Sequence, residues 1–131
     1  MTRSHPDTGI IVLAHGSRDP QWRAPIEAVA DILAQHHPHW MVTCAYLELC
    51  EPALPQVLDQ WNAAGVQRVS IHPLFLGAGR HVREDLPRMI DALRDQFPQM
   101  NLTLHTPIGE NARLTAFMAD LITESMTPSQ A

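Results

Sequence analysis

The amino-acid sequence predicts an α/β fold, with a four-stranded parallel sheet and helices on both faces. Short apolar segments of strand length alternate four times with longer segments whose apolar residues recur at helical spacing. This alternation is typical of βαβ units, whose right-handed crossovers place parallel strands side by side. The 131 residues suit one domain, with a core over about 10–125 and loose tails at 1–8 and 127–131.

Four segments are expected to form the strands. The first, Ile10–Ala14, is apolar throughout, as a strand buried on both faces should be. The others cover about Met41–Leu47, Val69–Phe75 and Asn101–His105. Because parallel strands all point the same way, the residues that follow them should gather at one edge of the sheet.

Each strand segment is followed by a segment with apolar residues three or four positions apart, which predicts a helix. Pro52 opens the second helix, and Gly65 suits its carboxyl end. Pro55 and Pro87 are tolerated only in a first turn, so these helices should begin later than the apolar pattern suggests. The apolar positions are Trp22, Ile26, Val29 and Leu33; Leu54, Val57, Leu58 and Trp61; Leu86, Ile90, Leu93 and Phe97; and Leu114, Phe117, Leu121 and Ile122.

Composition excludes several classes of protein. A net charge of −5 argues against a nucleic-acid surface, and no apolar run approaches the roughly 20 residues of a membrane span. No apolar stretch precedes Ile10, so we expect no secretory signal and a cytoplasmic location. Two cysteines are too few for a disulfide framework; Cys44 is expected in the core, and Cys50 is a weak site candidate.

Three ionisable residues stand where strand-like segments end: His15, Glu48 and His81. If the strands are parallel, the three side chains converge on the sheet edge where open α/β folds bind their ligands. Two imidazoles and one carboxylate suit a divalent metal ion and leave coordination positions open. A single histidine at a strand end is more often structural, so the combination carries the prediction.

All nine basic residues are arginine. Codon bias from a GC-rich genome would explain this without any function. The alternative is that some guanidinium groups bind carboxylates, which arginine does with two parallel hydrogen bonds. Arg18, Arg80 and Arg83 flank the two site histidines, so the functional interpretation is strongest for these three.

The remaining histidines and motifs point elsewhere. His36, His37 and His39 cluster at the end of the first helix, opposite the predicted site, and are expected to be solvated. His72 is expected in the core, while His105 ends the fourth strand on the functional edge and could contact substrate. There is no glycine-rich dinucleotide fingerprint, Walker lysine or nucleophile elbow.

Four blocks, "LAHGSRDP", "AYLELCEP", "PLFLGAGRHVREDLP" and "PIGENARL", resemble the small class II chelatases that act on sirohydrochlorin. The resemblance covers about residues 10–122 and is specific in combination. It implies a single flavodoxin-like chelatase half-domain of the short form, working as a homodimer. It also implies that His15, Glu48 and His81 bind the metal and face the macrocycle, with no organic cofactor.

The resemblance implies a divalent metal ion as substrate: cobalt first, with iron or nickel as alternatives. The macrocycle carries peripheral carboxylates, which Arg18, Arg80 and Arg83 would bind, and backbone N–H groups near Ser17 and Gly79 could add donors. Two other functions remain open: a metal chaperone or sensor without tetrapyrrole chemistry, and a different small-molecule enzyme on the same scaffold. The sequence leaves the physiological metal and pathway open.

Overall fold

The computed structural model describes residues 7–126, along which strands and helices alternate. The predicted tails at 1–6 and 127–131 lie outside the described residues, whereas Thr8, assigned to a tail, begins the first strand. The elements are β1 (Thr8–Ala14), α1 (Pro20–His36), β2 (Met41–Tyr46), α2 (Leu54–Ala63), β3 (Arg68–Pro73), α3 (Arg80–Gln96), β4 (Asn101–Leu104), the short 3₁₀ helix η1 (Ile108–Glu110) and α4 (Ala112–Ser125).

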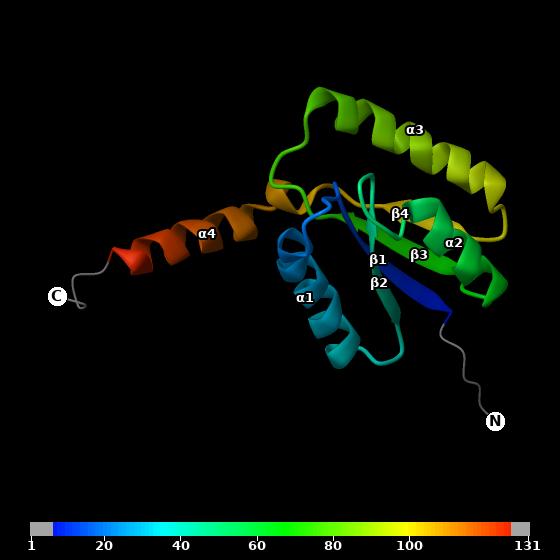
Figure 1. Cartoon of the computed structure of the whole chain (residues 1–131), viewed down its shortest axis with the longest axis horizontal. Coiled ribbons are helices and arrows are strands. Elements are labelled where there is room, and N and C mark those ends of the chain that lie inside the picture. Colours follow the sequence, from blue (N-terminus) through cyan, green and yellow to red (C-terminus); the bar gives the residue numbers. More distant parts are fainter. Residues whose placement is uncertain (1–6, 127–131) are drawn as a thin grey trace.

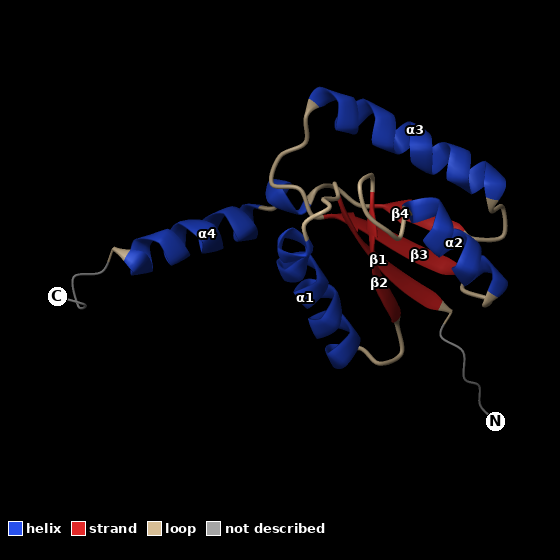
Figure 2. Ribbon diagram, in the orientation of Figure 1, coloured by secondary structure: helices blue, strands red, loops and turns tan. Residues whose placement is uncertain are grey.

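The four strands form one parallel sheet in the order β2-β1-β3-β4 (Figure 1 and Figure 2). In the central strand β1, Ile11 lies opposite Thr43 of β2 and Ile71 of β3. All carboxyl ends of the strands therefore meet at one edge. The predicted fold class, a four-stranded parallel sheet with helices on both faces, is confirmed.

The larger part of the core lies between the sheet and helices α2 and α3. Ile11 and Leu13 of β1 point to this face, as do Val69 and Ile71 of β3. The two helices contribute Leu54, Val57, Leu58, Trp61, Leu86, Ile90 and Leu93. Gly9 lets the indole of Trp61 reach the sheet, because a Cβ at residue 9 would lie 2.2 Å from that ring.

Helix α1 covers the opposite face, over β1 and β2. Val12 and Ala14 of β1 point to this side, and α1 contributes Ala30, with Ile26 and Leu33 packed beside it. The Asp19 carboxylate accepts a hydrogen bond from the Gln21 amide at 2.9 Å and so caps the helix. This second core is smaller because it rests on one helix.

The prolines gave one correct and one wrong prediction. Pro55 lies in the first turn of α2, as expected. Pro87 lies well inside α3, so α3 does not begin late. A proline inside a helix costs about 3 kcal/mol. The buried side chains of Leu86, Ile90 and Leu93 offset this, since burying three such residues contributes roughly 5–9 kcal/mol.

Helix α4 covers neither face of the sheet. It projects away from the other elements (Figure 1), and no residue of it is buried. Phe117 is 57% exposed and Ile122 66% exposed, so the apolar positions that predicted this helix do not pack on the sheet. Within the described residues, no helix combines the length and apolarity that crossing a membrane would need.

Candidate functional site

His15 directly follows β1 and begins the loop that leads into α1. Gly16 comes next, with φ +112°, a conformation that favours glycine. The loop is shaped by its own polar groups: the Ser17 hydroxyl accepts from the Asp19 amide at 3.1 Å, and the Arg23 guanidinium donates to the Ser17 carbonyl at 3.1 Å. The Ser17 side chain thus helps to form the loop in which it lies.

Glu48 lies in a tight loop after β2. The Tyr46 amide donates to the Pro52 carbonyl at 2.9 Å and closes the base of this loop. At its tip, the Cys50 amide donates to the Glu48 carbonyl at 2.9 Å, with Leu49 between them at φ +69°. This is the hydrogen-bond pattern of a three-residue turn with positive φ at its centre.

The backbone joins the His15 and Glu48 loops directly. The His15 carbonyl accepts from the Leu47 amide at 3.1 Å and from the Glu48 amide at 2.9 Å. The loop between β3 and α3 contributes a side chain to this contact. Its Phe75 stacks on the His15 imidazole, with ring centroids 4.5 Å apart. Three loops that are distant in sequence therefore meet around His15.

His81 does not end a strand, as the sequence suggested, but lies in the first turn of α3. Residues 74–80 separate His81 from the end of β3 at Pro73. It lines a hollow of about 170 Å³ together with Leu47, the neighbour of Glu48, and with Met89 further along α3. The hollow is thus bounded by the loop that carries Glu48 and by the start of α3.

His15, Glu48 and His81 all have exposed side chains. Within residues 7–126, no three His, Cys, Asp or Glu side chains are grouped closely enough to hold a metal ion. The structure therefore gathers the three loops at one edge without assembling their side chains into a ligand set. Exposed side chains keep their rotamer freedom, so their donor atoms can turn toward an incoming ion.

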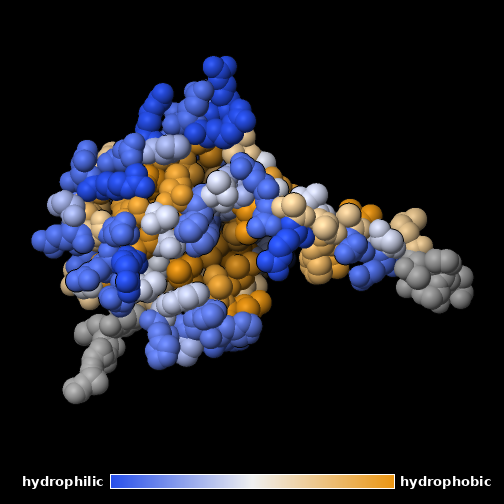
Figure 3. Space-filling view, turned by 180° about the vertical axis from the view of Figure 1, so that it is seen from behind, coloured by the Kyte–Doolittle hydropathy of each residue, from blue (hydrophilic) through white to orange (hydrophobic). Residues whose placement is uncertain are grey.

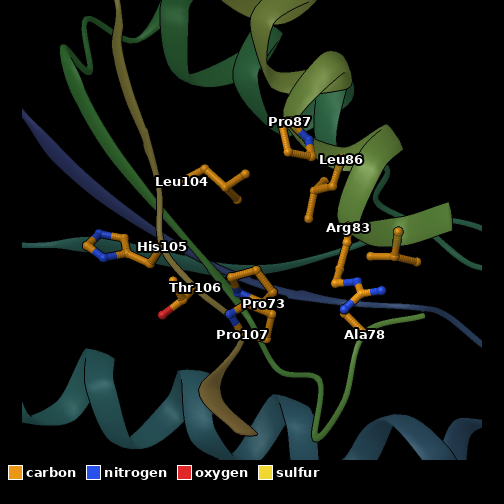
Figure 4. Close-up of a pocket in the computed structure, with 10 residues that line it drawn as sticks. Pro73, Ala78, Arg83, Leu86, Pro87, Leu104, His105, Thr106 and Pro107 are labelled. Atoms are coloured by element: carbon orange, nitrogen blue, oxygen red, sulfur yellow. The ribbon is translucent and has the colours of Figure 1, made fainter. Parts of the chain in front are cut away.

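The three predicted arginines differ in their surroundings. Arg18 is exposed in the β1–α1 loop, and Arg80 forms an exposed ion pair with Glu84 at 3.2 Å. Arg83 lines a mostly apolar cavity of about 210 Å³ between α3 and the end of β4. In Figure 4 its side chain extends toward Ala78. Gly79 precedes α3, and its carbonyl accepts from the Arg83 amide at 3.0 Å.

His105 follows β4, and its imidazole stacks on His72 with ring centroids 4.1 Å apart. In Figure 4 its ring points away from Leu104 and Leu86, but His105 still forms part of the lining of the cavity beside Arg83. His72 is half-buried rather than in the core. Burial lowers the pKa of His72, and the neighbouring His105 lowers it further.

The cysteines are free. Cys44 is buried as predicted, and burial raises the pKa of its thiol, which keeps it protonated at neutral pH. Cys50 is half-buried and packs beside the α1-side core. The exposed His36 and His37 lie at the end of α1 and just beyond it, and the His37 ring stacks on Trp40.

Sequence reasoning missed two residues that shape the site. Phe75 supports the His15 ring, and Gly16 allows the close approach of the Glu48 loop, since a Cβ at residue 16 would lie 1.7 Å from the Glu48 carbonyl oxygen. The glycine that directly follows His15 in the sequence could have indicated that another loop approaches closely at this point. Nothing local in the sequence pairs Phe75 with His15.

Comparisons with known proteins show the family and the fold to which this chain is similar. The family model described as CbiX matches residues 9–125. A CbiX protein from Marinobacter aquaeolei has a similar crystal structure, with a TM-score of 0.80 and 36% identity over 91% of this chain and 97% of that one. The sirohydrochlorin cobaltochelatase of Methanopyrus kandleri is 30% identical, over 89% of this chain and 96% of its own.

The sirohydrochlorin cobaltochelatase of Methanosarcina barkeri is 30% identical over 82 residues. That alignment covers 63% of this chain and 63% of the relative. Similarity thus extends over almost the full length of two of these three proteins and over less than two thirds of the third.

Proposed function

This chain belongs to the CbiX family, and from that premise we propose that it inserts a divalent metal ion into a sirohydrochlorin-type tetrapyrrole. Cobalt is the first candidate, because the Methanopyrus and Methanosarcina relatives are cobaltochelatases. One observation carries the proposal: the His15 backbone carbonyl accepts a hydrogen bond from the Glu48 backbone amide at 2.9 Å. This backbone bond places the residues that carry an imidazole and a carboxylate next to each other at the edge where the carboxyl ends of the strands meet.

His15, Glu48 and His81 are proposed to receive the metal, which is a substrate here. Imidazole and carboxylate groups ligate without filling the coordination shell, so water on the ion can exchange for pyrrole nitrogens. Insertion also releases two protons from the macrocycle. A neutral imidazole or the Glu48 carboxylate can accept them, and their exposure lets the protons pass on to solvent.

The carboxylates at the rim of the macrocycle are proposed to bind Arg18, Arg80 and Arg83. The Arg80–Glu84 pair costs little to break, because exposed ion pairs contribute about 0–1 kcal/mol. A substrate carboxylate can therefore replace Glu84. Backbone N–H groups near Ser17 and at the start of α3 after Gly79 would add donors for the same anionic groups.

The other parts of the proposal concern the state of the protein. We propose that it acts as one domain, in the cytoplasm, as a homodimer. It would need no organic cofactor and would bind neither nucleic acid nor membrane. The net charge of −5 supports the statement on nucleic acid.

The test is anaerobic incubation of the full chain with sirohydrochlorin and one metal at a time: Co²⁺, Ni²⁺ or Fe²⁺. Absorbance spectra give the rate of metal insertion, and a sample without protein gives the spontaneous rate. Acceleration with at least one metal is expected. Metal binding without any change in insertion rate would contradict the enzyme and favour a metal chaperone or sensor.

A further inference from the structure

Leu49 combines an unfavourable backbone conformation with an exposed apolar side chain. It is the central residue of the turn in which the Cys50 amide donates to the Glu48 carbonyl at 2.9 Å, and its φ is +69°. Leucine is uncommon at positive φ, because its Cβ crowds the backbone there. The side chain is 48% exposed and lies outside the buried core. Packing within the chain therefore does not offset the strain, and strain of this kind tends to mark functional positions.

Leu76 is a second exposed leucine at the same edge of the sheet. It directly follows Phe75, whose ring stacks on His15, and its side chain is 68% exposed. The backbone at this point is held by η1. The Gly109 amide donates to the Phe75 carbonyl at 2.9 Å, and a Cβ at residue 109 would approach the Leu76 carbonyl oxygen to 1.9 Å. The chain thus fixes Leu76 in place while leaving its side chain uncovered.

The two leucines lie on either side of the His15 loop. The strand order β2-β1-β3 puts the loop of Leu49, after β2, on one side of it and the loop of Leu76, after β3, on the other. Strands β2 and β3 are two strand spacings apart, or roughly 10 Å. Each leucine also directly follows a residue that contacts His15, because Glu48 binds its carbonyl and Phe75 stacks on its ring.

Cationic side chains stand around this apolar pair. Arg18 follows His15 in the same loop, and Arg80 and Arg83 lie at the start of α3, directly after the loop of Leu76. Figure 3 shows hydrophilic residues gathered around the start of α3, at the top of the view. The edge of the sheet thus presents two apolar side chains near His15 and guanidinium groups further out.

This pattern matches the chemistry of a flat ring with apolar faces and an anionic rim. We propose that Leu49 and Leu76 bind one face of the tetrapyrrole and hold its plane against His15 and Glu48, an inference that rests on the proposed function. Covering the two side chains removes apolar surface of both protein and ring from water. Holding the plane also places the pyrrole nitrogens where a metal on the site can reach them.

The strain at Leu49 makes this role separable from a structural one. Asparagine has nearly the same size as leucine, adopts positive φ more readily and is polar. In Leu49→Asn the fold should therefore be as stable as in the wild type or more so, whereas the contact with the ring is lost. A leucine that served only the fold would behave in the opposite way.

The experiment is an anaerobic titration of the full chain with metal-free sirohydrochlorin, followed by absorbance. In Leu49→Asn and in Leu76→Asn the Kd is expected to rise about three- to tenfold, as expected from leaving half or more of a leucine side chain in water. Methionine at either position is the matched conservative variant and should keep the Kd within about twofold of wild type, because it restores apolar contact. Co²⁺ binding without the macrocycle should not change, because neither leucine supplies a metal donor.

Denaturation curves complete the test. The midpoint of Leu49→Asn is expected at or above that of the wild type. An unchanged Kd in both asparagine variants would overturn the inference, and so would a lower midpoint accompanied by weaker Co²⁺ binding, because the leucines would then act through the fold. These results differ from a failure of the proposed function, in which the wild type itself neither binds sirohydrochlorin nor inserts metal.

Discussion

Gly16 lies against the backbone of Glu48: a Cβ at residue 16 would approach the Glu48 carbonyl oxygen to 1.7 Å. The same glycine has φ +112°. Both the lack of space and the backbone conformation therefore exclude a side chain at residue 16. The loops that carry His15 and Glu48 touch each other at this glycine.

The first prediction concerns this contact. Gly16→Ala should lower the free energy of unfolding by at least about 1–3 kcal/mol, the usual cost of such a backbone conformation for a residue with a side chain. It should also slow metal insertion by displacing the Glu48 loop. Gly77→Ala is the control, because nothing lies within 4 Å of a Cβ there. Equal denaturation midpoints for the two variants would contradict the steric argument.

The second prediction concerns the proposed metal-binding residues. His15→Ala and His81→Ala should each reduce the insertion rate by about 10²-fold or more, because each removes a metal donor and a proton acceptor. Glu48→Gln should reduce the rate while tetrapyrrole binding, measured by its absorbance shift, is kept. His39→Ala, an exposed histidine outside the proposed site, should retain the wild-type rate. Full activity in both site histidine variants with normal circular dichroism would exclude the assignment.

The third prediction concerns substrate binding by arginine. Replacing Arg18, Arg80 or Arg83 by alanine should raise KM for the tetrapyrrole more than it lowers kcat, since these groups bind the rim of the macrocycle and not its reacting centre. Lysine should restore binding only in part, because it lacks the two-pronged geometry of the guanidinium. Arg88→Ala is the matched control on α3, where Arg88 pairs with Asp85 at 3.5 Å. Unchanged KM in all three site variants would refute carboxylate binding.

The fourth prediction concerns pH and His72. Burial, and secondly His105, lower the pKa of His72 in the folded chain. Below about pH 6.5 the unfolded chain takes up a proton at this residue that the folded chain resists, so the free energy of unfolding falls as the pH drops, until it passes the lowered pKa. His72→Gln should make this fall shallower in denaturation curves between about pH 7.5 and 5. His36→Gln should not, and identical slopes for all three proteins would assign the effect to other groups.

Local sequence patterns were enough to predict the order of strands and helices along the chain and the edge of the sheet where the loops meet. They misplaced His81, because an apolar run continues past the end of β3 at Pro73 and hides the loop that precedes α3. They also misjudged Pro87, because a rule based on a lost backbone hydrogen bond ignores the burial of Leu86 and Ile90 beside it.

Helix α4 shows a further limit of sequence reasoning. The spacing of Leu114, Phe117 and Leu121 defines which side of the helix is apolar. It does not say against which surface that side packs. The direction of α4 depends on the contacts of Gly109 with Phe75 and Leu76, residues more than 30 positions earlier, and a window that reads one helix at a time does not include them.

The strand order has a consequence for how this site can change in evolution. Because β1 lies between β2 and β3, the chain winds outward from it in both directions, and α1 and α2 depart to opposite faces of the sheet. A crevice opens at such a topological switch point whatever the side chains are. The position of residue 15 is thus set by the winding of the chain and its reactivity by the imidazole, so new chemistry at this point requires new side chains but no new fold.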